Sequence, residues 1–129
     1  MLNDELAPYS ACGPSVWDGV KPDISAPGFA ILSAYGTGDA DYAESYDMSM
    51  ATPHVADTIA LLLSSQPKYT METVKRILIC TAEKKGLVPT NPTCGSTPDS
   101  KWINNQWDSG RLNTYDAHIN LYPQLSTRP

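Results

Sequence analysis

Residues 49–67, SMATPHVADTIALLLSSQP, carry the strongest helix pattern in the chain. Ser49 is a residue type preferred at a helix N-cap, and Pro53 falls near the start, where a helix tolerates proline best. Apolar residues then recur at helical spacing, and a polar run that ends at Pro67 closes the pattern. The uninterrupted apolar stretch Ile59–Leu63 predicts that most of this helix is buried.

Two further helices are expected downstream. The first spans Thr70 to Lys85 and ends at Gly86. The second is short and begins at Asn113, whose side chain suits a helix cap. Between them, residues 87–107 are rich in Pro, Thr, Asn and Ser, which predicts a long surface loop.

Upstream of the long helix, the pattern changes to strands and turns. Residues 6–16 predict a short strand that leads into a turn at Gly13-Pro14. Phe29–Tyr35 predicts a buried strand, and residues 39–48 predict a polar loop. Eleven prolines and eight glycines separate these segments, and no internal repeat is present.

The composition is typical of one folded, acidic domain over residues 1–129. Hydrophobic residues make up 41% of the chain and charged residues 18%, and the formal net charge is −5. An acidic balance without a basic cluster argues against nucleic acid and anionic membranes as partners. The longest apolar run, Ile59–Leu63, is far shorter than the roughly 20 residues that span a bilayer. The start, MLNDELAPY, lacks the features of a signal peptide, and localisation stays open.

The three cysteines, Cys12, Cys80 and Cys94, are too few for a disulfide scaffold. None belongs to a C-x-x-C pair of the kind that binds zinc. A Cys80–Cys94 bridge in an oxidising compartment and free thiols are both compatible with this pattern. The redox compartment is therefore undecided.

Ser49 has two interpretations. A serine at a helix N-terminus can present its hydroxyl as a nucleophile, while its backbone N–H points at negative charge that develops nearby. Serine is also one of the commonest helix caps, so position alone favours the structural role. The flanking residues change that balance.

Four segments resemble motifs of a known protein family and follow one another in the same order as in that family. They are SACGP at 10–14, KPDISAPG at 21–28, DMSMATPHVAD at 47–57 and SGRLN at 109–113. They resemble S-S-x-G-P, K-P-D-I-x-A-P-G, G-T-S-M-A-[TAS]-P-H-V-A-G and G-x-G-x-[LIV]-[ND] of the subtilisin-like serine proteases, the subtilase or peptidase S8 family. The resemblance covers roughly residues 6–121 and corresponds to the C-terminal half of the family's catalytic domain.

The resemblance implies that Ser49 is the nucleophile of peptide-bond hydrolysis, with its backbone N–H as an oxyanion donor and a peptide or protein as substrate. It places the catalytic His, its Asp partner and the oxyanion Asn in the N-terminal half, so this chain holds no complete triad. The implied fold is α/β, a partial doubly wound, mainly parallel sheet flanked by helices. Because half of such a sheet exposes an edge and an apolar face, we expect self-association or a complementary chain.

Three residues depart from the family pattern. Asp47 and Met48 replace the Gly-Thr pair before the nucleophile, and Asp57 replaces a glycine on the helix. A fixed negative charge beside a developing oxyanion raises the barrier, and a buried, unpartnered Asp57 would be costly. These departures favour the alternative that the chain is an inactive subtilase-like remnant with a binding or structural role. The intact Ser49 favours a portion of an endopeptidase.

The other titratable candidates are expected to be structural. His54 lies about 140° around the helix and roughly 7.5 Å along it from the serine, so it faces away from the hydroxyl. His118, in the last helix, is expected to be exposed. Subtilases often bind calcium, but Asp39, Asp41 and Glu44 match no recognised calcium loop, so no metal site or cofactor is assigned.

Overall fold

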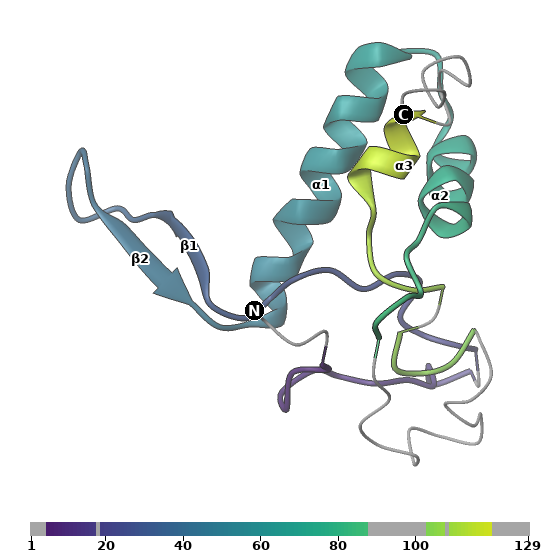
Figure 1. Cartoon of the computed structure of the whole chain (residues 1–129), viewed down its shortest axis with the longest axis horizontal. Coiled ribbons are helices and arrows are strands. Elements are labelled where there is room, and N and C mark those ends of the chain that lie inside the picture. Colours follow the sequence, from purple (N-terminus) through teal and green to yellow (C-terminus); the bar gives the residue numbers. More distant parts are fainter. Residues whose placement is uncertain (1–4, 18, 88–102, 108, 120–129) are drawn as a thin grey trace.

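The structure, a computed structural model of the 129-residue chain, describes residues 5–17, 19–87, 103–107 and 109–119. Its elements follow the order β1 (Ile31–Ala34), β2 (Tyr42–Ser45), α1 (Met48–Ser65), α2 (Met71–Cys80) and α3 (Thr114–Ile119). Figure 1 shows α3 between α1 and α2, with the β1–β2 hairpin extending away from the three helices.

The core lies where the three helices meet. Leu62 of α1, Val74 and Leu78 of α2, and Ala117 of α3 are each at most 5% exposed. A hydrogen bond of 2.7 Å between the hydroxyls of Thr58 and Thr114 joins α1 to α3. No helix in the described part of the chain combines the length and the apolar character needed to cross a membrane.

Helix α1 forms where it is expected, but its burial differs from the prediction. Thr58 and Leu62 are its buried residues, whereas Leu61 is 54% exposed. The prediction of a mostly buried helix is therefore wrong for this chain. An apolar run is buried only where something packs against it, and the described residues cover one stripe of α1.

Helices α2 and α3 are capped as their sequences predict. The Thr70 hydroxyl accepts the Thr73 N–H at 3.2 Å, and the Asn113 side chain accepts the Asp116 N–H at 2.9 Å. Helix α2 ends at Cys80, five residues before the expected Lys85. It ends early because the chain beyond it pairs through its backbone, at Glu83, with the segment that leads into α3.

The sheet differs most from expectation. Strand β1 pairs antiparallel with β2, in a register that sets Ile31 opposite Ser45 and Ala34 opposite Tyr42. The region 39–48, expected as a loop, thus supplies a strand, and the expected buried strand is largely exposed, with Leu32 at 68%. Residues 6–16 contain no strand. The described residues therefore form a two-stranded sheet, and they do not display the doubly wound parallel sheet.

The structure differs from both cysteine arrangements that the sequence left open. Cys12 is disulfide-bonded, and Cys80 is an exposed free thiol. A Cys80–Cys94 bridge is therefore absent, and Cys94 itself lies outside the described residues. Cys80 is the last residue of α2 and lies on its solvent side.

The expected surface loop is wrong at its downstream end. Residues 104–107 are buried, with Asn104 only 1% exposed, while most of the expected loop lies outside the described residues. Asn104 Oδ1 accepts the backbone N–H groups of Gln106 and Trp107 at 3.0 and 2.9 Å. The Gly13 N–H is shared between the carbonyls of Asn105 and Lys21. These bonds tie the N-terminal segment to the C-terminal part.

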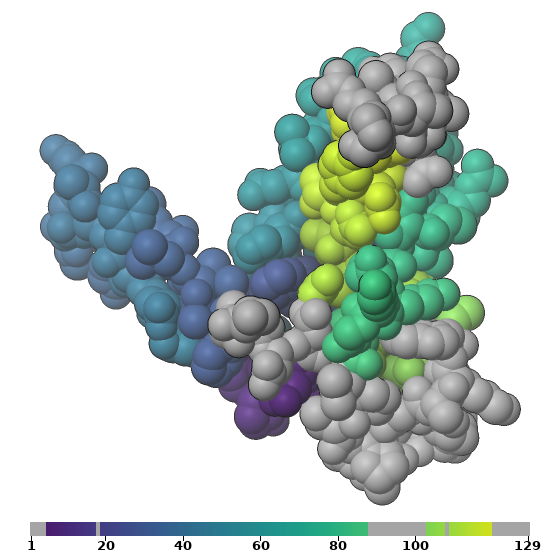
Figure 2. Space-filling view, in the orientation of Figure 1, coloured from purple at the N-terminus to yellow at the C-terminus, as the bar shows by residue number. Residues whose placement is uncertain are grey.

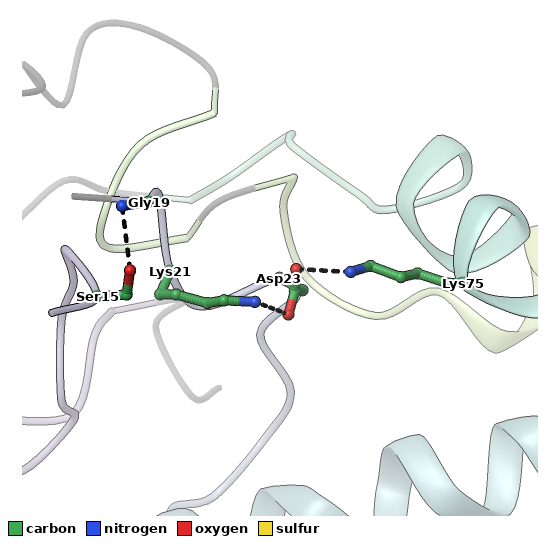
Figure 3. A network of polar contacts seen from close by, with 5 residues as sticks. All are labelled: Ser15, Gly19, Lys21, Asp23 and Lys75. Carbon is green, nitrogen blue, oxygen red and sulfur yellow. Dashed lines mark hydrogen bonds and ion pairs between the residues drawn. The ribbon is translucent and has the colours of Figure 1, made fainter. Parts of the chain in front are cut away.

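An ion pair between Asp23 and Lys75 anchors the KPDISAPG segment to α2 (Figure 3). Asp23 contacts the ammonium groups of both Lys21 and Lys75, the latter at 3.1 Å. The hydrogen bond from Lys21, with a smaller contribution from Lys75, lowers the pKa of Asp23 below its ordinary 3.8. Just upstream, the Ser15 hydroxyl accepts the Gly19 N–H at 3.0 Å and closes the preceding turn.

Candidate active site

Ser49 is the second residue of α1, and its side chain is exposed. The N-cap is Asp47, so the expectation that Ser49 itself caps the helix is wrong. Asp47 Oδ1 accepts the Ser49 N–H at 2.6 Å and the Ser49 hydroxyl at 2.5 Å. Asp47 is the better cap because a carboxylate satisfies a free helix N–H and also interacts favourably with the helix dipole.

Two bonds to the main chain fix the backbone of Asp47. Its N–H donates to the Gly28 carbonyl, and its own carbonyl accepts the Met50 N–H, each at 3.0 Å. Gly28 lies so close that a Cβ on it would be 2.8 Å from the Asp47 oxygen. The glycine that ends KPDISAPG is therefore needed to let this segment approach the start of α1.

Met48 joins a third motif to the same place. Its sulfur accepts the Ala11 N–H at 3.2 Å, which brings the SACGP segment against the helix start. Three of the four segments that carry the resemblance thus converge within a few residues of Ser49. Sequence alone identifies these segments, but not the contacts that Asp47 and Met48 make between them.

The Asp47 carboxylate is held in its charged form. The hydrogen bond from the Ser49 hydroxyl, and then the bond from the Ser49 backbone, lower the pKa of Asp47 below its ordinary 3.8. Asp57, by contrast, lies exposed on α1, so the cost expected for a buried carboxylate does not arise. Asp47 is therefore the departure from the family pattern that contacts the candidate nucleophile.

Neither histidine of the chain contacts Ser49. His54 Nδ1 lies 2.9 Å from the Met50 carbonyl of the preceding turn, so that nitrogen carries the proton and binds the helix backbone. His118 lies at the C-terminal end of α3 and is half-buried, whereas the sequence analysis expected it to be exposed. The described residues thus bring no imidazole to the serine hydroxyl.

Two acidic residues of the hairpin accept hydrogen bonds from nearby hydroxyls. Asp41 accepts the Thr37 hydroxyl at 2.6 Å, and Glu44 accepts the Tyr46 hydroxyl. Within the described ranges, no three His, Cys, Asp or Glu side chains group in a way that would hold a metal ion. These carboxylates bind local hydroxyls instead of converging.

A cavity of about 810 Å³ lies beside the start of α1. Its walls come from residues 5–11, 22 and 24–29, from Asp47 and the N-terminal part of α1, and from residues 106, 107, 111 and 112. Trp107, which is 6% exposed, lines it, and its Nε1 has no hydrogen-bond partner in the described part of the chain. In Figure 2 the hairpin stands apart from the helical body, with open space between them.

The family model Peptidase_S8, described as the subtilase family, matches residues 1–107. Bacillopeptidase F of Bacillus subtilis (strain 168) is 38% identical over 118 residues, which cover 90% of this chain and 7% of that protein. The minor extracellular protease Vpr of the same organism is 38% identical over 87 residues, covering 63% of this chain and 11% of the relative.

Two solved structures share the fold of the chain. The CspB protease of Clostridium perfringens matches with a TM-score of 0.67 at 24% identity, over 91% of this chain and 24% of its own. The prenylagaramide maturation protease PagA matches with a TM-score of 0.52 at 30% identity, over 81% of this chain and 33% of its own. Both likenesses are consistent with an α/β fold.

These matches define the class: the chain belongs to the subtilase family, as its motifs predict. It is a small part of the proteins it resembles, because it spans about a tenth or less of the length of these two curated relatives. The role of Ser49 follows from neither comparison and stays a prediction.

Proposed function

We propose that this chain is the C-terminal part of a subtilisin-like serine endopeptidase domain and contributes its nucleophile, Ser49. The observation that carries the proposal is the exposed Ser49 hydroxyl at the N-terminus of α1, inside a motif of the subtilase family. That position combines a presented hydroxyl with a backbone N–H aimed at developing negative charge.

In the proposed reaction, Ser49 Oγ attacks the carbonyl carbon of a peptide bond while a histidine base accepts the hydroxyl proton. The oxyanion of the tetrahedral intermediate is stabilised by the Ser49 N–H. Collapse breaks the C–N bond, and the base returns its proton to the leaving amine. Water then releases the acyl group from Ser49. The base and its Asp partner would come from polypeptide outside residues 1–129.

Two features support a complementary polypeptide. The cavity beside α1 is lined by apolar side chains such as Ile24, Val55 and Leu112. Leu61 on the uncovered side of α1 is more than half exposed. We propose that the remainder of a doubly wound sheet covers these surfaces, and that residues 1–129 are one part of that domain.

A second candidate is an inactive subtilase-like module that binds or stabilises another chain. The contact between the Asp47 carboxylate and the Ser49 hydroxyl favours it, because it engages the nucleophile in the ground state. The two candidates differ in whether Ser49 turns over substrate once the domain is complete.

Co-expression tests this difference. Residues 1–129 would be produced with the part of bacillopeptidase F that precedes its matched region, and the purified complex assayed with a fluorogenic peptide. We expect hydrolysis that Ser49→Ala abolishes and that Ser64→Ala, a change at an exposed serine of the same helix, leaves intact. A folded complex without Ser49-dependent hydrolysis would favour the inactive module.

A further inference from the structure

We infer that Asp47 is a built-in inhibitory residue, whose carboxylate occupies the oxyanion position in front of α1 and holds the Ser49 hydroxyl through the same oxygen. The inference rests on the proposed role of Ser49. It adds an autoinhibitory contact that the family pattern, with glycine at this position, does not contain.

The geometry shows why substrate and carboxylate would compete. Asp47 Oδ1 lies 2.6 Å from the Ser49 nitrogen. A reacting oxyanion needs the same donor at about 2.7–3.1 Å. The oxyanion and Asp47 Oδ1 therefore cannot both accept the Ser49 N–H. As the oxyanion gains charge, the nearby carboxylate also repels it. Attack at Ser49 therefore requires the Asp47 side chain to swing away.

The second effect concerns the hydroxyl proton. Ser49 Oγ donates to Asp47 at 2.5 Å, so its hydrogen points at the carboxylate instead of at an imidazole. Asp47 is too weak a base to keep that proton at neutral pH, since its pKa lies below 3.8. The contact thus holds the nucleophile without activating it.

The contact is reversible because the Asp47 side chain is exposed while its backbone is fixed. The titratable side chains that share the cavity with Asp47 are Glu5, Tyr9 and Arg111. The bonds that lower the pKa of Asp47 come from Ser49 alone. Breaking one pair of hydrogen bonds is therefore what releases Ser49.

An NMR titration of the full chain tests the contact without requiring activity. We expect the Ser49 amide proton to shift with the ionisation of Asp47, with a midpoint below 3.8, because a carboxylate that accepts an N–H changes that proton's environment. Asp47→Asn should abolish this titration, whereas Asp57→Asn should leave it intact. A Ser49 amide that does not titrate, or that still titrates in Asp47→Asn, overturns the inference.

The inhibitory effect is measured in the co-expressed complex by the rate of Ser49 labelling with a fluorophosphonate. We expect Asp47→Gly to raise the rate by about 10- to 100-fold, because losing one oxyanion donor costs about 100- to 1,000-fold and an exposed carboxylate vacates its place part of the time. Asp57→Gly restores the other family glycine and should leave the rate unchanged. Equal rates for wild type and Asp47→Gly overturn the inference while leaving the proposed function intact. Absence of labelling in both overturns the proposed function, and the titration then decides whether Asp47 holds Ser49.

Discussion

Replacing Gly28 with alanine should disturb the start of α1. Among the described glycines, Gly28 is the one at which an added Cβ would meet atoms of this region. The new Cβ would lie 2.8 Å from the Asp47 carbonyl oxygen and 3.6 Å from the Ala51 Cβ. The first distance is well inside van der Waals contact, and the atom it meets is backbone. The KPDISAPG segment and the helix must therefore separate, which strains the bond from the Asp47 N–H to the Gly28 carbonyl.

We expect Gly28→Ala to lower the free energy of unfolding by about 1–3 kcal/mol, the usual cost of inserting a methyl group where there is no room. Gly36→Ala is the matched control, because a Cβ there meets nothing within 4 Å. The control should be neutral or stabilise by about 0.4–1 kcal/mol through the unfolded chain. Urea unfolding of both variants measures the difference. Equal stabilities for the two would refute the claim that close approach at Gly28 positions the helix start.

Three further predictions concern stability and thiol reactivity. Leu62→Ala should cost about 2–5 kcal/mol in urea unfolding, whereas Leu61→Ala on the exposed side should cost far less; similar losses would contradict the assigned core. Because its folded-state pKa is depressed, Asp23 should stabilise the fold above pH 3.8 and lose this contribution as the pH falls through its folded pKa. Melting temperatures of wild type and Asp23→Asn against pH would show this, and parallel curves would refute it. A maleimide should modify Cys80 but not Cys12 before reduction, as peptide mass spectrometry would reveal; the reverse pattern would contradict the thiol assignment.

The helices were predictable from local patterns, whereas their ends depended on distant residues. Cap residues identify the starts at Thr70 and Asn113 because a cap acts within three residues of itself. The end of α2 depends on pairing between Glu83 and Arg111, which lie far apart in the sequence. The helical spacing of apolar residues therefore cannot predict where α2 ends.

The burial of apolar segments was harder to predict for a physical reason. The pattern of α1 and of Phe29–Tyr35 indicates surfaces suited to burial, but burial requires a partner that covers them. The described residues cover Leu62 and leave Leu32 and Leu61 open. These exposed apolar segments are the surfaces that the proposed complementary polypeptide would cover.

The motif locates the candidate site, but the sequence analysis assigned the helix cap to the wrong residue. The sequence singled out Asp47 as a charge near a future oxyanion. An Asp two residues before a serine at a helix start is also a capping pattern, and that signal would have identified Asp47, not Ser49, as the N-cap. This capping pattern predicts the hydrogen bond from the Ser49 N–H to the Asp47 carboxylate.

The central claim, that Ser49 is a nucleophile lacking its partners, is tested most directly by fluorophosphonate labelling. The probe would be applied to the isolated 129-residue chain and to the chain co-expressed with the upstream part of bacillopeptidase F, with the labelled residue identified by mass spectrometry. We predict no adduct in the isolated chain and an adduct on Ser49 in the complex, lost in Ser49→Ala. Labelling of Ser49 in the isolated chain, or its absence from a folded complex, would contradict the account.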